Sequence, residues 1–349
     1  MDFLGTPSHP SFGLDTFGDT GLEADIPTPM AQVIREVVEE GVLADAVGLD
    51  YIGLGEHHRA DYAISSPDVV LAAIAARTQR IRLGTGVTVL SSDDPVRVFE
   101  RFATLDAISS GRAEVTMGRG SFVESFPLFG YELEDYEPLF SEKLDLWARL
   151  LDEGPVTWQG RFRPALDGRQ PFPTTERGRL PTWVGVGGTP ESVVRAASYG
   201  FPLVLAVIGG SPARFAPLVE LYHRALAQQG LDPLPVAMHC PGHVAATDEQ
   251  AREEHFGPQR DTFARIGKER GWGEPMSRDD YDTMCGPQGA YFVGSPETVA
   301  EKIAGAMRTL GLSRFQLKYA VGALSHEARC ESIRLYGTEV VPRVREMLA

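Results

Sequence analysis

Short apolar runs alternate with helical patterns along the whole chain, and this alternation constrains the fold more than any other feature. Eight runs have the length and composition of buried strands, and segments with helical spacing of apolar residues separate them. Eight strands with intervening helices predict an α/β fold of the (β/α)8 barrel type, with a doubly wound parallel sheet as the alternative. The predicted strands are Phe12–Phe17, Tyr51–Leu54, Ile81–Leu90, Ala113–Met117, Thr182–Val186, Leu203–Ile208, Val236–Ala246 and Arg314–Tyr319.

Helix starts are marked by Ser, Thr or Asp followed by Pro, a cap followed by proline at the first helical position. No internal repeat and no long linker divides the chain, so residues 1–349 are predicted to form a single domain. Three insertions, at about 118–137, 154–180 and 248–290, supply material for the rim of a site at the C-terminal ends of the strands. The predicted helices are Pro29–Val47, Ser66–Thr78, Asp94–Gly111, Pro138–Leu151, Thr189 onward, Ala213–Gln229, Ser295–Leu310 and His326–Leu348.

Charge and cysteine content restrict the partners. With 33 Lys and Arg against 48 Asp and Glu, the net charge is −15, which disfavours nucleic acid and anionic membrane surfaces. The three cysteines are scattered and lack metal-ligand spacing, so neither a disulfide framework nor a metal site is expected. The segment Met1–Asp15 has no export-signal pattern, and the apolar runs are too short for a membrane span, so a cytoplasmic location is expected.

Two adjacent histidines follow the second predicted strand, in Gly55-Glu56-His57-His58. A residue at a strand end projects into the mouth of a barrel, where a histidine can move protons. Neighbouring residues of an extended strand point to opposite sides, so at most one of the two faces the cavity. A packed histidine or a metal pair is the alternative, although the six other histidines offer no further ligand at a telling spacing.

Glycines interrupt the third strand and end the fourth. In Leu83-Gly84-Thr85-Gly86-Val87, two glycines weaken an apolar strand unless some group approaches the backbone closely. The group that approaches could be the flat ring of a ligand, or a neighbouring side chain in a tightly packed barrel. In Gly118-Arg119-Gly120-Ser121, glycines leave space around a guanidinium, which suits a phosphate. An ion pair between Arg119 and a rim carboxylate is the competing interpretation.

The fifth strand runs directly into a helix through Gly185-Val186-Gly187-Gly188-Thr189-Pro190-Glu191-Ser192. Free amides at the helix start and the hydroxyls of Thr189 and Ser192 would form an anion cradle, although an ordinary helix cap is the alternative. Together with Arg119, this turn predicts a phosphorylated cofactor. His239, His243, Lys318 and Tyr319 are weaker candidates, for which a core or solvated role is the alternative.

Taken in order, these motifs resemble the bacterial luciferase-like, flavin-dependent monooxygenase family. The resemblance is closest over Tyr51–Gly130 and continues more weakly through Trp183–Gly200 and Gly294–Val341. The motifs that carry it are Gly55-Glu56-His57-His58, Gly84-Thr85-Gly86-Val87, Asp94-Pro95-Val96-Arg97, Leu105-Asp106, Ser110-Gly111-Arg112, Gly118-Arg119-Gly120 and Phe129-Gly130.

The resemblance implies a TIM barrel that binds FMN at the C-terminal ends of its strands. It implies a cis peptide bond at Gly86–Val87, a phosphate contact by Arg119 and a catalytic role for His57. The chain departs from the luciferases at Gly118, where they carry a reactive cysteine, and at Gly188, where they carry a side chain near the phosphate. The implied cofactor-binding residues are Asp15, Thr16, Phe17, Gly86, Val87, Gly118, Arg119, Gly120, Ser121, Gly187, Gly188, Thr189 and Ser192.

The function implied by the resemblance is that of a two-component monooxygenase, which uses reduced FMN and O2 to oxidise a small organic substrate. A separate flavin reductase would supply the reduced cofactor, and the relatives suggest a homodimer. The alternatives are hydride transfer with a deazaflavin, a non-catalytic flavin-binding barrel, and an aldolase-like barrel with a Schiff base on Lys318. The variable rim loops select the substrate, so the motifs do not identify it.

Overall fold

The computed structural model describes residues 9–23, 26–271 and 275–349. Residues 1–8, which belong to the segment Met1–Asp15, and residues 272–274 of the third insertion lie outside the described residues. Within the described ranges, no helix combines the length and the apolar character that crossing a membrane requires.

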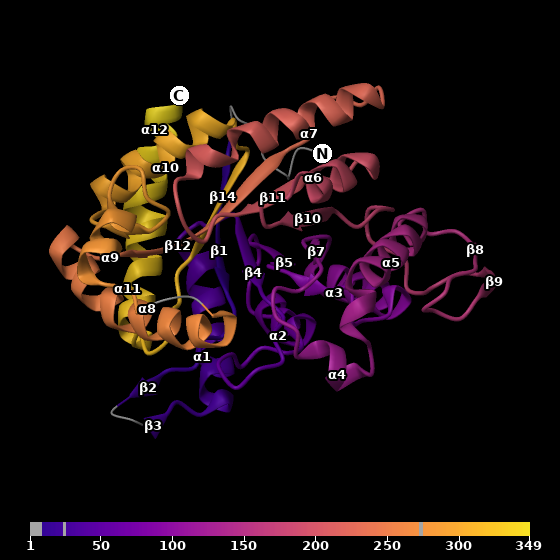
Figure 1. Ribbon diagram of the computed structural model, residues 1–349, viewed down its shortest axis with the longest axis horizontal. Coiled ribbons are helices and arrows are strands. Elements are labelled where there is room, and N and C mark those ends of the chain that lie inside the picture. Colours follow the sequence, from indigo (N-terminus) through magenta and orange to yellow (C-terminus); the bar gives the residue numbers. More distant parts are fainter. Residues whose placement is uncertain (1–8, 24–25, 272–274) are drawn as a thin grey trace.

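The strands form a closed parallel barrel (Figure 1). They pair in the order β5–β4–β1–β14–β12–β11–β10–β7–β6, and β5 and β6 are the two halves of the predicted third strand. A parallel bridge between Leu83 and Ala113 joins β5 to the start of β7 and closes the sheet, which confirms the barrel over the doubly wound sheet. The barrel strands are β1 (Ser11–Thr16), β4 (Tyr51–Leu54), β5 (Arg82–Thr85), β6 (Thr88–Val89), β7 (Val115–Gly118), β10 (Thr182–Val186), β11 (Leu203–Ala206), β12 (Val236–Val244) and β14 (Arg314–Lys318).

Helices pack outside the barrel between successive strands, and Figure 1 shows α11 and α12 one after the other along one flank, with α10 packed beside α12. The predicted caps divide into two groups. Asp94 accepts hydrogen bonds from the amides of Val96 and Arg97, and Ser295 accepts one from Thr298, whereas Ser66 and Thr189 make no side-chain cap bond. The helices are α1 (Met30–Ala46), α2 (Pro67–Ala75), α3 (Pro95–Ser109), α5 (Tyr136–Leu150), α6 (Pro190–Ser198), α7 (Ala216–Gln228), α10 (Pro296–Leu310), α11 (His326–Leu335) and α12 (Val341–Leu348).

The insertions contain more regular structure than the sequence predicts. The second forms the antiparallel hairpin of β8 and β9, and the third is mainly the helices α8 and α9 followed by β13. The predicted final helix is divided by a π-helical turn at Tyr336–Val340, directly before Pro342, whose missing amide cannot continue an α-helical ladder. The additional elements are β2 (Leu22–Glu23), β3 (Ile26–Pro27), α4 (Ser125–Phe129), η2 (Leu133–Asp135), β8 (Val156–Trp158), β9 (Leu166–Arg169), η3 (Pro212–Phe215), α8 (Asp248–Arg270), α9 (Arg278–Cys285) and β13 (Phe292–Gly294).

Side chains alternate along each strand between the barrel interior and the helix layer. On β1, Phe12 and Leu14 are fully buried in the main apolar core, while Asp15 lines a cavity at the barrel mouth. Lower in the barrel, Arg314 forms a buried ion pair with Glu114. The Arg314 guanidinium lies 4.6 Å from the ring centre of Tyr51 and 4.5 Å from that of Trp183, and these groups close the barrel floor beneath the cavity.

Candidate active site

A cavity of about 820 Å³ opens at the C-terminal ends of the barrel strands. Strand ends form its floor and walls, and helix α8 from the third insertion contributes Gln259, Thr262, Phe263 and Ile266 to its lining. The volume lies within the usual range for small-molecule and cofactor sites, at the position where barrel enzymes hold theirs.

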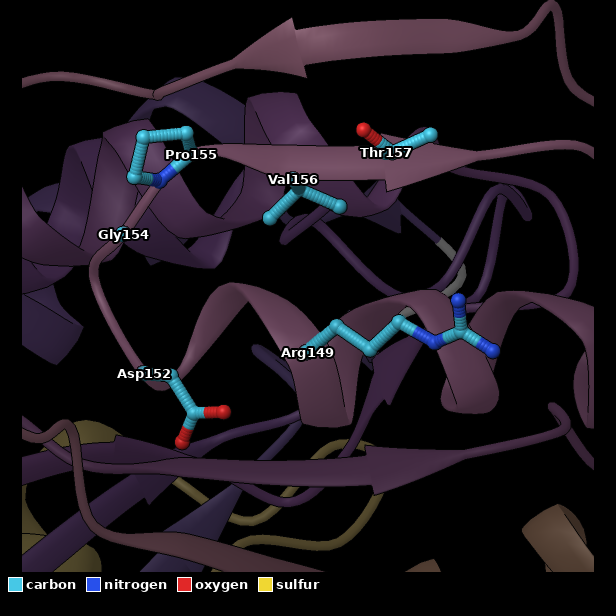
Figure 2. Close-up of a pocket in the computed structure, with 6 residues that line it drawn as sticks. All are labelled: Arg149, Asp152, Gly154, Pro155, Val156 and Thr157. Atoms are coloured by element: carbon cyan, nitrogen blue, oxygen red, sulfur yellow. The ribbon is translucent and has the colours of Figure 1, made fainter.

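Figure 2 shows a second, smaller hollow of about 170 Å³ between the end of α5 and the start of β8. It is lined by Arg149, Asp152 and the segment 154–157, and it lies apart from the strand ends that carry the predicted site residues. A hollow of this size is below the range for organic ligands, so the larger cavity is the candidate site.

Three predicted anion-binding residues meet at one edge of the cavity. Arg119 donates from Nη2 to Ser192 Oγ at 3.2 Å, and Ser192 Oγ lies 2.8 Å from Thr189 Oγ1. Thr189 therefore bonds to the Ser192 hydroxyl instead of capping α6. Arg119 also forms an ion pair with Glu137, a half-exposed carboxylate that pairs with Arg195 as well. The rim ion pair and the approach of Arg119 to the strand-five turn are thus both present.

The glycine-rich wall next to this corner contains the predicted cis peptide bond at Gly86–Val87. A Cβ atom at Gly118 would overlap the Val87 side chain, and one at Gly185 would lie 2.9 Å from it, so both glycines make room for Val87. This explains why a cysteine is not accommodated at position 118. The glycines of β5 serve packing as well, since Tyr51 fills the space beside Gly84 and Asp15 fills the space beside Gly86.

His57, and not His58, faces the cavity. His58 turns away and bonds Glu56 Oε1 at 2.9 Å. The His57 ring lies among aromatic rings, with centroids 4.6 Å from Phe17, 4.5 Å from Tyr62 and 5.4 Å from Phe122. Burial, assisted by the nearby cations Lys318 and Arg59, lowers the pKa of His57 to about 3, so its imidazole is neutral at pH 7.

The end of β1 contributes Asp15 and Phe17 to the cavity, whereas Thr16 is a correction to the predicted set. Strand alternation turns Thr16 outward, where its hydroxyl accepts a hydrogen bond from the Gly18 amide at 3.1 Å. Asp15 Oδ2 lies 2.9 Å from His239 Nδ1, and both side chains are buried. His239, a weak candidate in the sequence, is therefore part of the site.

The other weak candidates occupy different places. Lys318 lines the cavity, but its side-chain nitrogen is held in an ion pair by Asp19 at 2.9 Å. His243 is buried beside Glu254, and Tyr319 donates to Glu40 at 2.6 Å behind the barrel wall.

The remaining predicted residues divide by position. Gly120, Ser121 and Gly187 line the cavity, whereas Gly188, with φ of +120°, Thr189 and Ser192 are not part of its lining, and Ser192 is reached only through its contact with Arg119. Tyr62, Phe122, Tyr291 and the α8 residues line the cavity without any sequence motif. Of these, Phe122 and the α8 residues lie in the predicted rim insertions, which is the one signal that could have indicated them. Among the described residues, no group of three or more His, Cys, Asp or Glu side chains is placed to hold a metal ion.

The sequence of this chain is similar to a known protein family and to curated proteins. A family model described as luciferase-like monooxygenase matches residues 15–314. The 4-hydroxyprotoasukamycin monooxygenase of Streptomyces nodosus subsp. asukaensis is 31% identical over 218 residues, which are 60% of this chain and 59% of that protein. The alignment thus spans less than two thirds of that relative.

Two solved structures share the fold. The oxygenating constituent of 3,6-diketocamphane monooxygenase from Pseudomonas putida, a type II Baeyer–Villiger monooxygenase in complex with FMN, superimposes with a TM-score of 0.77 at 20% identity, covering 95% of this chain and 98% of that chain. The coenzyme F420-dependent tetrahydromethanopterin reductase of Methanopyrus kandleri gives a TM-score of 0.71 at 19% identity, covering 95% and 99%. At these identities the likeness establishes a common barrel.

Proposed function

This chain belongs to the luciferase-like monooxygenase family, and from that premise we propose that it is an FMN-dependent monooxygenase acting on a small organic substrate. The observation that carries the proposal is the layout of one cavity. Its lining includes the Arg119 guanidinium, which contacts the Ser192 hydroxyl and through it Thr189, and its interior holds His57 among aromatic rings. A separate reductase would deliver the reduced cofactor.

The donors fit FMN. Arg119, Ser192 and Thr189 offer charged and neutral hydrogen bonds to a phosphate, and the cavity wall beside them, where glycines make room for the apolar Val87 side chain, suits a flat ring. Reduced FMN, when bound, supplies the electrons that activate O2 for transfer of one oxygen atom to the substrate. The protein's own contribution is to bind and orient the cofactor and the substrate, and to exclude water from the cavity.

His57 is the residue we propose to manage a proton beside the reacting atoms. Because its pKa is about 3, the imidazole is a neutral acceptor at pH 7 and adds no charge to the cavity. Phe17, Tyr62 and Phe122 surround it and limit the access of water, which would favour oxygen transfer over wasteful release of hydrogen peroxide.

Deazaflavin-dependent hydride transfer is the second candidate, because a relative of this fold is a coenzyme F420-dependent reductase. Anaerobic titration with reduced FMN and with reduced F420 distinguishes the two. We expect tight binding of reduced FMN, weaker binding of the oxidised form, and O2 consumption coupled to substrate oxidation. Preferential binding of F420 would overturn the FMN assignment, and tight FMN binding without O2 consumption would indicate a non-catalytic barrel.

A further inference from the structure

Asp15 and His239 form a buried carboxylate–imidazole pair on the cavity wall. Asp15 lies at the end of β1 and His239 on β12, and strand β14 separates them in the sheet. The Asp15 Oδ2–His239 Nδ1 distance of 2.9 Å fixes the orientation of the imidazole ring. Because Nδ1 is held in this way, Nε2 is the ring nitrogen available to a molecule in the cavity.

The second carboxylate oxygen shows that the pair is more than packing. Asp15 Oδ1 is buried and has no hydrogen-bond partner among the described residues. It fills the space beside Gly53 and Gly86, where a Cβ atom at Gly53 would overlap it. Leaving a buried polar atom unpaired destabilises a protein, so the site holds a carboxylate that folding alone does not require.

The charged groups around the neighbouring rings already have hydrogen-bond partners within the protein. Lys318, whose ammonium lies 4.8 Å from the Phe17 ring, pairs with Asp19. Glu56 pairs with His58 and accepts a bond from the Val89 amide at 2.9 Å. Arg270, 4.8 Å from the Phe122 ring, donates to the Ser121 carbonyl at 2.6 Å. This half of the cavity therefore suits an uncharged molecule with an aromatic or otherwise flat apolar body.

We propose that Asp15 and His239 are an acid–base dyad that binds and deprotonates the hydroxyl group of an uncharged phenolic or enolic substrate. The inference rests on the proposed function and names its substrate class. In the step, the substrate O–H bond breaks and an N–H bond forms on His239 Nε2, while the electron pair stays on the substrate oxygen. His239 is the catalytic residue, and Asp15 is a positioning residue that stabilises the resulting imidazolium.

The acidity of the hydroxyl group defines the class of substrate that the dyad can deprotonate. An imidazole transfers a proton efficiently only when the pKa of its partner is not far above its own. A phenol, whose pKa is about 10, meets this condition, whereas water and alkyl alcohols, whose pKa values are far higher, do not. The resulting phenolate or enolate is the electron-rich form of the substrate, which accepts the transferred oxygen atom more readily than the neutral form.

The groups that face the dyad influence its charge. Burial raises the pKa of Asp15, and the hydrogen bond from His239 opposes this shift. Cations on the neighbouring strand also favour the ionised carboxylate. The charged and titratable groups that act on Asp15 or respond to it are His239, Arg314, Lys318, Tyr51 and Tyr336.

Binding of 4-nitrophenol tests the proposal, because its ionised form absorbs visible light and its neutral form does not. Difference spectra are recorded with and without saturating FMN, at a pH where free 4-nitrophenol is mainly neutral. We expect the bound molecule to be mainly ionised, with its pKa lowered by about one unit or more. We expect the same result for the protein without flavin, so a failure of the FMN assignment does not alter this outcome.

Matched variants separate catalysis from structure. His239→Gln should abolish the shift, while Asp15→Asn, which can still accept the Nδ1 hydrogen bond, should retain binding and lose part of the shift. The control is His243→Gln, because His243 is a buried, carboxylate-paired histidine on the same strand but outside the cavity. Thermal unfolding of each variant establishes that it folds. Absence of 4-nitrophenol binding, or an equal shift in the wild type and both dyad variants, would overturn the proposal.

Discussion

Two anions would compete for the guanidinium of Arg119. Glu137 occupies one side of it in this structure, and the proposed phosphate would approach from the cavity side through Ser192. Glu137 is 48% exposed and also pairs with Arg195, so it has an alternative partner when Arg119 turns to a ligand. The rim carboxylate therefore opposes anion binding by charge and by competition.

Removing that charge should strengthen FMN binding. We expect Glu137→Gln to lower the Kd for FMN by about threefold to tenfold, because the phosphate no longer competes with a carboxylate. Equilibrium titration of flavin fluorescence measures the change, with Glu134→Gln as the control, an exposed carboxylate three residues away. Weaker binding in Glu137→Gln would show that the carboxylate organises the site instead of competing for it.

Residue-scale features were predictable where a local motif carried them. The Glu-His-His motif identified His57, and the Gly-Arg-Gly motif identified Arg119, but alternation alone could not decide between His57 and His58. His239 and Asp15 are 224 residues apart, and their contact depends on the register of β1, β14 and β12. No local pattern encodes that register. For the same reason, Thr16 was grouped with inward-facing neighbours although it points outward.

At the scale of elements, the barrel floor joins β7 to β14. Glu114, directly before β7, pairs with Arg314 at the start of β14 and with Arg82 on β5 at 2.8 Å. The Glu114 and Arg314 side chains are at most 1% exposed. A charge buried this deeply is stable only while its partner remains.

Breaking this pair should destabilise the barrel strongly. Glu114→Gln leaves the Arg314 guanidinium without a full counter-charge, and we expect a loss of about 3–5 kcal/mol in the free energy of unfolding. Urea denaturation followed by circular dichroism measures it. Glu39→Gln, which breaks the exposed pair with Arg77, is the control and should cause little change. Equal effects in the two variants would contradict the role assigned to the floor.

The eight strands were predictable because each combines an apolar outward face with a short length set by the barrel. The hairpin of β8 and β9 was missed because β9 is mostly exposed and the apolar alternation of β8, from Val156 to Trp158, is only three residues long. The three-residue strand β13 pairs only with the upper half of β12 and is too short to show a period. Strands this short leave a weak periodic pattern in one sequence.

For the whole molecule, a buried cluster ties the first helix of the barrel to the last part of the chain. Glu40 on α1 accepts hydrogen bonds from Tyr319, from Arg329 at 2.7 Å and from His326 at 2.9 Å. The hydrogen bond to Glu40 raises the pKa of His326, and its cationic partners lower the pKa of Glu40. The contribution of this cluster to the free energy of unfolding therefore depends on pH.

The sign of that dependence follows from the raised pKa of His326. Its stabilising contribution is full below about pH 6.5, the value in the unfolded chain, and is lost as the pH rises through the folded value. We expect His326→Gln to be less stable than the wild type at pH 6, with the difference fading by pH 9 in urea denaturation. Burial lowers the pKa of His223, so His223→Gln should show the opposite trend. A pH-independent difference for His326→Gln would refute the assignment.

The central claim is that the cavity binds a flavin through its phosphate at Arg119 and Ser192. The most direct test compares the Kd values for FMN and riboflavin, which differ only in that phosphate, in the wild type and in Arg119→Gln. Charge-assisted hydrogen bonds of this kind are worth about 1.5–3 kcal/mol, so the wild type should bind FMN about 10 to 100 times more tightly than riboflavin. In Arg119→Gln the preference should largely disappear. Equal affinity of the wild type for both molecules would contradict the account.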